Sequence, residues 1–192
     1  TKKKQVSTDF FKPEVSIDPN LLIETVQRLE KAKKPVIYSG GGVINSGERA
    51  VNLLRKLVSK TNFPITSTLM GLGSYPASGD NWLGMLGMHG TYEANMSMHD
   101  CDFMLCVGAR FDDRITGRID AFSPNSFKVH IDIDPSSVNK NVTVDVPLIG
   151  DVSIILEELT SSWEKRGSKV STKELVQWWK EIGKWKEVKS LK

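Results

Sequence analysis

The sequence is poor in cysteine and contains no long apolar run. Its two cysteines, Cys101 and Cys106, form neither a C-x-x-C pair nor a metal-ligand spacing. We predict that both are reduced core residues of a cytosolic protein. No stretch approaches the roughly 20 apolar residues that a membrane-spanning helix requires. The first residues also lack the apolar core of a secretory signal, so we expect a cytoplasmic protein without a membrane partner.

A strong net charge is also lacking, because 26 basic and 23 acidic residues leave a formal charge of +3. Much of the basic excess lies in residues 2–4 and in the lysine-rich last segment, where no aromatic platform accompanies it. We therefore expect solvated ends and no nucleic-acid partner. The hydrophobic content of 39% is ordinary for a globular protein, and 192 residues suffice for one substantial core.

Histidine is scarce, with three residues in the chain. His130 alternates with apolar residues of a predicted strand, His99 has no partner spacing, and His89 lies in a loop where a ligand could bind. No set of nucleophile, base and orienting residue can be assembled from the sequence. We predict neither a catalytic residue nor a metal site in this chain.

Short apolar runs alternate with segments of helical periodicity along most of the chain. This alternation predicts an α/β fold: a doubly wound, mostly parallel sheet of about five or six strands with helices on both faces. Strands are predicted at residues 35–39, 64–68, 103–107, 127–134 and 141–146, and helices from residue 19, at about 46–60, 91–99, 152–165 and 172–189. Residues 69–90 are rich in glycine and are predicted to be a long loop that is either functional or disordered.

The segment 102–117 carries the densest group of charges next to a strand. Its apolar run ends in Gly108, and two arginines and two aspartates follow within a few positions. The charges should therefore lie at the carboxyl end of a buried strand, which is where open α/β sheets bind ligands. Arg110 offers a planar fork of donors that suits a diphosphate or a carboxylate. A solvated loop in which the acids and arginines neutralise one another is the alternative.

A glycine-rich turn, GGGVINSGE from Gly40, follows the first strand. Such a turn lets a phosphate approach the backbone, although this one lacks the spacing of a dinucleotide fingerprint and the lysine of a P-loop. The second strand ends without the acid that usually binds the ribose. If a nucleotide binds, Asp132, Asp134 or Asp151 must accept its hydrogen bonds. Alternatively, Asp151 is a helix cap and Asp134 starts a turn.

Several motifs together carry a family resemblance. They are LGMLGMHGTYEAN at 83–95, VGARFDDRITGRID at 107–120, GGGVI at 40–44, ITSTLMGLGSYP at 65–76 and HIDIDP at 130–135. Over roughly residues 18–185 the chain resembles the central domain of the acetohydroxyacid synthases, also called acetolactate synthases. This thiamine-diphosphate enzyme family condenses two pyruvates, or pyruvate and 2-ketobutyrate, in branched-chain amino acid biosynthesis. The resemblance implies an FAD/NAD-binding-like central domain that holds FAD in an extended form.

The resemblance also assigns residues to that cofactor. The diphosphate and ribityl region would lie near Gly40, Gly42, Gly108 and Arg110. The flavin side would be lined by Thr68, Leu69, Leu86, Gly87, Met88 and His89, and Asp112, Arg114 and Ile115 would touch the cofactor as well. The adenosine end would be held by Asp132, Ile133, Ser137, Gly150, Asp151 and Val152. Met88, Asp113 and Arg114 would face the substrate channel, where Arg114 would recognise the carboxylate of the second 2-ketoacid.

The same resemblance implies that the chain is one part of a larger subunit. Residues 1–17 would be a linker, 18–167 the FAD-binding central domain, and 168–192 a helix and linker toward a diphosphate-binding domain. Thiamine diphosphate and Mg would bind in the full-length enzyme only, so this part would be inactive alone. Its partners would be the other two domains of the subunit, further copies in a homodimer or tetramer, and a regulatory subunit.

Two other functions remain open. The chain could be a free-standing nucleotide-binding sensor or partner-binding module, because the fold alone does not define a function. A nicotinamide-dependent oxidoreductase is disfavoured by the missing strand-end acid and catalytic set. The last predicted helix carries three tryptophans, which pack either on a partner surface or back on the domain.

Overall fold

The computed structural model describes residues 17–169 and 171–188, with the side chains of residues 113 and 114 left undescribed. The predicted linker therefore lies outside the described residues except for Ile17. Six strands form a single sheet in the order β3-β2-β1-β4-β5-β6, and every neighbouring pair is parallel. The strands are β1 (Pro35–Ser39), β2 (Ile65–Ser67), β3 (Trp82–Met85), β4 (Phe103–Val107), β5 (Phe127–Asp132) and β6 (Val146–Ile149). The predicted doubly wound parallel sheet is confirmed.

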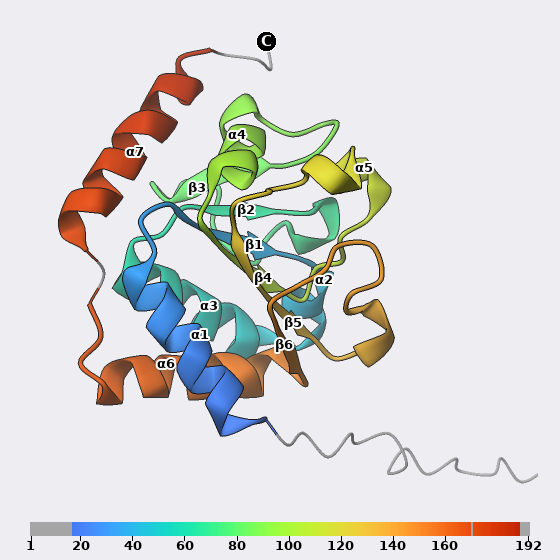
Figure 1. Ribbon diagram of the computed structural model, residues 1–192, viewed down its shortest axis with the longest axis vertical. Coiled ribbons are helices and arrows are strands. Elements are labelled where there is room, and N and C mark those ends of the chain that lie inside the picture. The colour runs from blue at the N-terminus through green and yellow to red at the C-terminus, as the bar shows by residue number, and fades with distance from the viewer. Residues whose placement is uncertain (1–16, 170, 189–192) are drawn as a thin grey trace, which may run out of the picture.

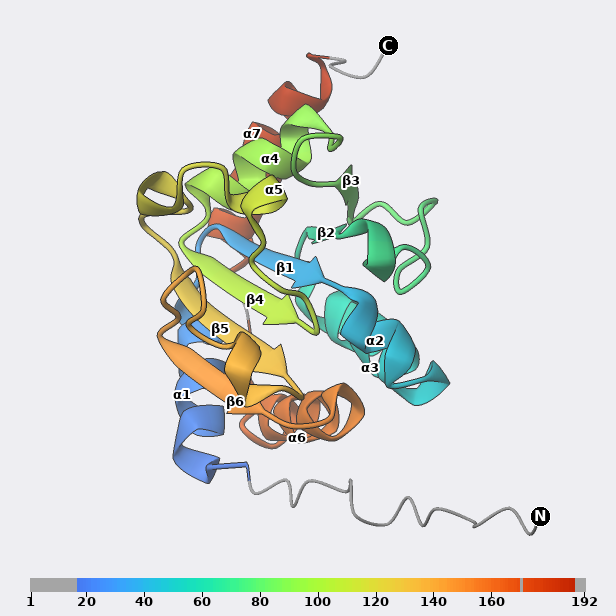
Figure 2. The same ribbon diagram turned by 90° about the vertical axis from the view of Figure 1, so that its right-hand side faces the viewer.

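Helices cover both faces of this sheet (Figure 1). The α-helices are α1 (Pro19–Lys31), α2 (Gly41–Asn45), α3 (Glu48–Thr61), α4 (Tyr92–Asp100), α5 (Asp113–Thr116), α6 (Val152–Lys165) and α7 (Thr172–Lys186). Short 3₁₀ turns lie at Leu69–Gly71, Ile119–Ala121 and Pro135–Ser137. The two views place α1, α3 and α6 together on one face and α4 with α7 on the other (Figures 1 and 2).

Three helices begin where the sequence places a capping residue. Asp18 accepts a hydrogen bond from the Asn20 amide and Pro19 occupies the first helical position of α1. Thr91 caps α4 and Asp151 caps α6 in the same way. These caps confirm the predicted helix starts and fix where the chain turns back from the sheet.

Two strands differ from the prediction. The fifth strand was predicted at 141–146, but β6 begins at Val146 and includes Pro147. Proline fits there because β6 is an edge strand, whose outward backbone positions need no N–H donor. The strand β3 lies inside the segment predicted as a loop. It has four residues, an irregular register with β2, and Gly84 at φ +88°, so it shows neither apolar alternation nor normal strand length.

The glycine-rich turn also differs from the prediction. The chain does not pass through a loop from β1 to a helix near residue 46. The short helix α2 begins at Gly41, directly after the strand, and α3 begins separately at Glu48 after Gly47 at φ +89°. The sequence did not predict α2 because its first residues are glycines, and glycine is a poor helix former.

The tryptophans of α7 pack back on the domain. Trp178 is fully buried and donates its indole N–H to the Pro35 carbonyl at 3.0 Å. Trp179 donates to the Asn62 carbonyl at 3.0 Å, and Trp185 contacts Trp178 edge to face with ring centroids 5.5 Å apart. The helix therefore closes one face of the core. Both cysteines are buried and free, as predicted.

Candidate functional site

The residues predicted to bind a ligand gather along one edge of the sheet. Because all six strands are parallel, their carboxyl ends meet at that edge, and the arrowheads of β1, β4 and β5 in Figure 2 point the same way. We call this edge the rim and define it by the segments that follow the strands: 40–46, 68–72, 86–91, 108–116, 132–137 and 150–152. All the predicted site residues lie in these segments.

The centre of the rim is the point where the strand order reverses, between β1 and β4. Here Gly42 donates its amide to the Gly108 carbonyl at 2.9 Å. A Cβ atom on Gly40 would lie 2.3 Å from the Gly108 oxygen, and one on Gly42 would lie 2.7 Å from the Gly108 Cα. Gly108 itself has φ +57°. These three glycines therefore let two backbone segments touch, and main-chain atoms form the floor of the rim.

Arg110 stands beside this floor with its side chain 67% exposed. Its guanidinium contacts the Asp112 carboxylate at 3.3 Å. Arg110 and Asp112 thus neutralise each other, as the alternative interpretation of this loop predicted. An exposed ion pair contributes little to stability, about 0–1 kcal/mol. The arginine therefore remains available to an anionic ligand that competes with Asp112.

Carboxylates occupy the other half of the rim. Asp132 is nearly buried at the end of β5, where its Oδ1 accepts from the Asp134 amide at 2.9 Å. Asp151 accepts from the Ser153 amide and hydroxyl at 2.8 and 2.6 Å and from the Ser46 hydroxyl at 2.8 Å. Burial opposes ionisation of Asp151, but the hydrogen bonds from Ser153 and Ser46 outweigh it and lower its pKa. Asp151 therefore joins the end of α2 to the start of α6.

Asp134 starts a turn, which is the alternative role that the sequence suggested for it. It caps the 3₁₀ turn by accepting from the Ser136 amide at 2.9 Å, and the Ser136 hydroxyl donates to it at 2.9 Å. These hydrogen bonds, that of the Ser136 side chain first, lower the pKa of this exposed carboxyl. Ser137 belongs to the same turn, at 3.4 Å from the Asp134 carboxylate.

Exposed apolar side chains follow β2, β3 and β5. Met88 is 77% exposed after β3, and Leu69 and Ile133 are also exposed. Sequence reasoning missed two neighbours, Met70 and Leu72, which are exposed in the same loop after β2. Apolar side chains that gather at a ligand-binding edge are typical of a surface that another apolar group covers.

Other predicted residues act through their backbone or pack inward. Thr68 caps the turn after β2 by accepting from the Gly71 amide, and Leu86 and Val152 are buried in the core. Gly87 exchanges two hydrogen bonds with the Asn95 amide group at 2.8 and 3.1 Å. The remaining members of the predicted set lie as follows: His89 after β3, Ile115 partly buried in α5, and Gly150 between β6 and α6. Asp113 and Arg114 begin α5, and their side chains lie outside the described residues.

A hollow of about 100 Å³ opens beside Arg110. It is lined by Arg110, Phe111, Asp112, Asp134, Ser136, Ser137, Lys140, Asn141 and Val142. Two cations, two carboxylates and two hydroxyls surround it, so its lining is polar. It provides room for a small polar group next to the guanidinium.

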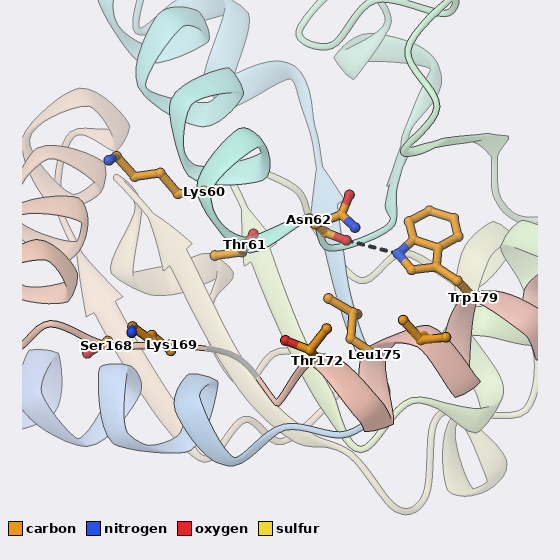
Figure 3. Close-up of a pocket in the computed structure, with 9 residues that line it drawn as sticks. Lys60, Thr61, Asn62, Ser168, Lys169, Thr172, Leu175 and Trp179 are labelled. Carbon is orange, nitrogen blue, oxygen red and sulfur yellow. Dashed lines mark hydrogen bonds between the residues drawn. The ribbon is translucent and has the colours of Figure 1, made fainter.

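A second hollow, of about 340 Å³, lies between the end of α3 and the start of α7 (Figure 3). Asn62 and Trp179 lie side by side at one end of it, where the indole N–H donates to the Asn62 carbonyl. Lys60 is already paired with Glu164 at 2.8 Å, and none of the described residues that line the hollow has a buried side-chain polar atom without a partner. Since Asn62 precedes β2, this hollow lies at the amino ends of the strands, away from the rim.

Within residues 17–169 and 171–188, no group of three histidine, cysteine, aspartate or glutamate residues could hold a metal ion. Over the same residues, no helix has the length and apolar character to cross a membrane. The groups that the rim presents are main-chain atoms, an arginine, carboxylates and apolar side chains.

Comparison with known proteins gives a consistent result. The family model described as the central domain of thiamine pyrophosphate enzymes matches residues 22–159. The chain is 42% identical over 188 residues to the acetolactate synthase large subunit of Buchnera aphidicola subsp. Schizaphis graminum, covering 98% of this chain and 32% of that protein. It is 41% identical over 189 residues to the Escherichia coli (strain K12) acetolactate synthase isozyme 3 large subunit, covering 98% and 33%. The chain thus spans about a third of the length of these curated relatives.

Proposed function

Because the chain belongs to the family of thiamine pyrophosphate enzyme central domains, we propose that it is the FAD-binding central domain of an acetolactate synthase large subunit. The observation that carries the proposal is the centre of the rim. There, a main-chain floor formed by three glycines lies next to an exposed arginine, at the strand-order reversal where doubly wound sheets bind nucleotides.

The groups of the rim fit the parts of an extended FAD molecule. The backbone floor and Arg110 suit a diphosphate, since arginine binds phosphate oxygens through two donors. The exposed side chains of Leu69 and Met88 suit an apolar ring system. Asp132 and Asp151 offer carboxylate oxygens to the hydroxyl and amino groups of adenosine. The complete proposed set is Gly40, Gly42, Thr68, Leu69, Leu86, Gly87, Met88, His89, Gly108, Arg110, Asp112, Arg114, Ile115, Asp132, Ile133, Ser137, Gly150, Asp151 and Val152.

Within the whole enzyme, we propose that this domain binds FAD and has a structural role. In the enzyme family that the chain resembles, FAD undergoes no net redox change. The condensation of two 2-ketoacids there uses thiamine diphosphate and Mg, which other domains hold. Residues 18–167 would form the FAD domain, with 1–17 as a linker and 168–192 as a helix and linker toward the diphosphate-binding domain. Met88, Asp113 and Arg114 would face the substrate channel. The assembly would be a cytoplasmic homodimer or tetramer with a regulatory subunit.

The proposal is tested by titrating the 192-residue chain with FAD, following flavin fluorescence and the unfolding temperature, with NAD and ADP as competing ligands. We expect saturable binding of FAD and none of NAD. Arg110→Ala should weaken FAD binding by about 2 kcal/mol, roughly 30-fold, if the charge pairs with the diphosphate.

Arg166→Ala is the matched control, because Arg166 also has one ion pair, with Glu30 at 3.4 Å, but lies at the end of α6 away from the rim. Equal FAD affinity for wild type and Arg110→Ala would contradict the assignment. Binding of ADP as tightly as FAD would instead favour a general nucleotide-binding module.

A further inference from the structure

The segment that carries Arg110 is held in an unusual way for an irregular loop. Residues 109–111 lie between β4 and α5 without regular secondary structure, yet each of their three carbonyl oxygens accepts a hydrogen bond from a side chain. Cys106 and His130 donate to the Ala109 carbonyl at 3.1 and 2.8 Å. Tyr38 donates to the Arg110 carbonyl at 3.2 Å, and the amide group of Asn141 donates to the Phe111 carbonyl at 2.7 Å.

Three of these donors form one row across the sheet. In the parallel register, Tyr38 of β1 lies beside Cys106 of β4, and Cys106 lies beside His130 of β5, so the three side chains share a face. All three residues are fully buried. Because a carbonyl oxygen can only accept, the Nε2 atom of His130 carries the proton in this contact. The row thus presents three donors to the overlying loop.

An aromatic ring closes the row from above. Phe111 packs against Tyr38 with ring centroids 6.0 Å apart and against His130 at 5.2 Å. Burial disfavours a charge on His130, but the Asp132 carboxylate and the Ala109 carbonyl that contact it raise its pKa. Buried polar groups are costly unless they are hydrogen-bonded, so the row and the loop carbonyls need each other. The backbone on both sides of Arg110 is consequently fixed.

Fixing that backbone matters for a side chain that must bind an anion. The guanidinium is exposed, and only its Asp112 contact is described in this structure. An arginine on a loosely held loop would lose backbone as well as side-chain freedom on binding. A backbone already held in place removes the first of these costs.

We propose that Tyr38, Cys106, His130 and Asn141 are positioning residues that hold the backbone of Arg110 so that its guanidinium meets the anionic group of the ligand. This inference rests on the proposed function, because the ligand is FAD and the anionic group is its diphosphate.

The test removes one hydroxyl from the row. In the 192-residue chain, Tyr38→Phe should weaken FAD binding about fivefold, the effect of one hydrogen bond, while the ring remains to pack on Phe111. The matched control is Tyr75→Phe, which also removes a hydroxyl hydrogen bond, to Asn81 at 3.4 Å, and should leave FAD binding unchanged. If Tyr38→Phe fails to fold, Asn141→Ala decides, because Asn141 is exposed and its loss should weaken FAD binding to a similar extent.

A double-mutant cycle separates positioning from a general effect on the fold. In the Arg110→Ala background, Tyr38→Phe should cause no further loss of FAD affinity, because the residue it positions is gone. A fivefold loss in both backgrounds would overturn the inference, since the hydroxyl would then act on the fold.

The proposed function and this inference fail in different ways. If the wild-type chain binds no FAD, both are overturned. If Arg110→Ala weakens FAD binding while Tyr38→Phe and Asn141→Ala do not, the inference is overturned and the proposed function stands.

Discussion

Adding a single methyl group at Gly40 should destabilise the domain severely. The new Cβ would lie 2.3 Å from the Gly108 oxygen and 2.5 Å from both the Cα and Cβ of Ala109. Gly40 has an ordinary extended φ of −128°, so backbone strain does not contribute. The clash is with the main chain and the Cβ atom of the segment 108–109, and none of these atoms can rotate away. Overpacking of this kind costs about 1–3 kcal/mol and more when backbone must move, so we expect about 3 kcal/mol or more for Gly40→Ala.

The assay is urea unfolding followed by tryptophan fluorescence, with Gly183→Ala as the control. Gly183 lies inside α7, and nothing lies within 4 Å of a Cβ placed there. The same methyl group should stabilise the protein at this position by up to about 1 kcal/mol, because alanine is the better helix former. A cost below about 1 kcal/mol for Gly40→Ala would refute the reasoning, since it would mean that the two segments do not touch as closely as described.

Three further outcomes follow from buried and capping groups. Asp151→Ala should lower the free energy of unfolding by about 1–2 kcal/mol at neutral pH. Because the folded-state pKa of Asp151 is lowered, its contribution is present above the unfolded pKa of about 3.9 and is lost as pH falls through the folded value. The difference in urea midpoints between wild type and variant should therefore shrink as the pH falls from about 5 to below the folded-state pKa. Trp178→Ala should cost about 3–5 kcal/mol and Trp179→Ala less than half of that in the same assay, because only Trp178 is fully buried. Burial raises the pKa of Cys101 to about 11 and raises that of Cys106, so a thiol reagent should modify neither in the folded chain and both in urea; rapid labelling without denaturant would contradict their burial.

The fold was largely predictable because its main elements follow local rules. The central strands β1 and β4 are short, mostly apolar segments that are fully buried, and their predicted bounds match the structure. The caps Asp18, Thr91 and Asp151 mark helix starts through contacts with residues two or three positions away. Such signals are contained in a short window of sequence. The edge strands were misplaced or missed because they are short and contain proline or glycine.

The site was predictable in its location but not in its internal contacts. Parallel strands bring their carboxyl ends together, so any loop after a strand is a fair candidate for the rim. The hydrogen bond from Ser46 to Asp151 joins residues 105 positions apart, so no local sequence pattern could predict it. The row of Tyr38, Cys106 and His130 likewise depends on the register of three strands, which the sequence alone does not define.

The two edge strands have a consequence for how this domain meets other chains. An exposed strand edge can pair with a strand from another molecule and lead to aggregation. In β6, Pro147 removes one backbone donor from the outer edge, and β3 is only four residues long with Gly84 in a positive-φ conformation. Neither edge offers a regular ladder of donors and acceptors. Pairing with a foreign strand is thus disfavoured at both edges, which favours contact with neighbouring chains through the helices and loops.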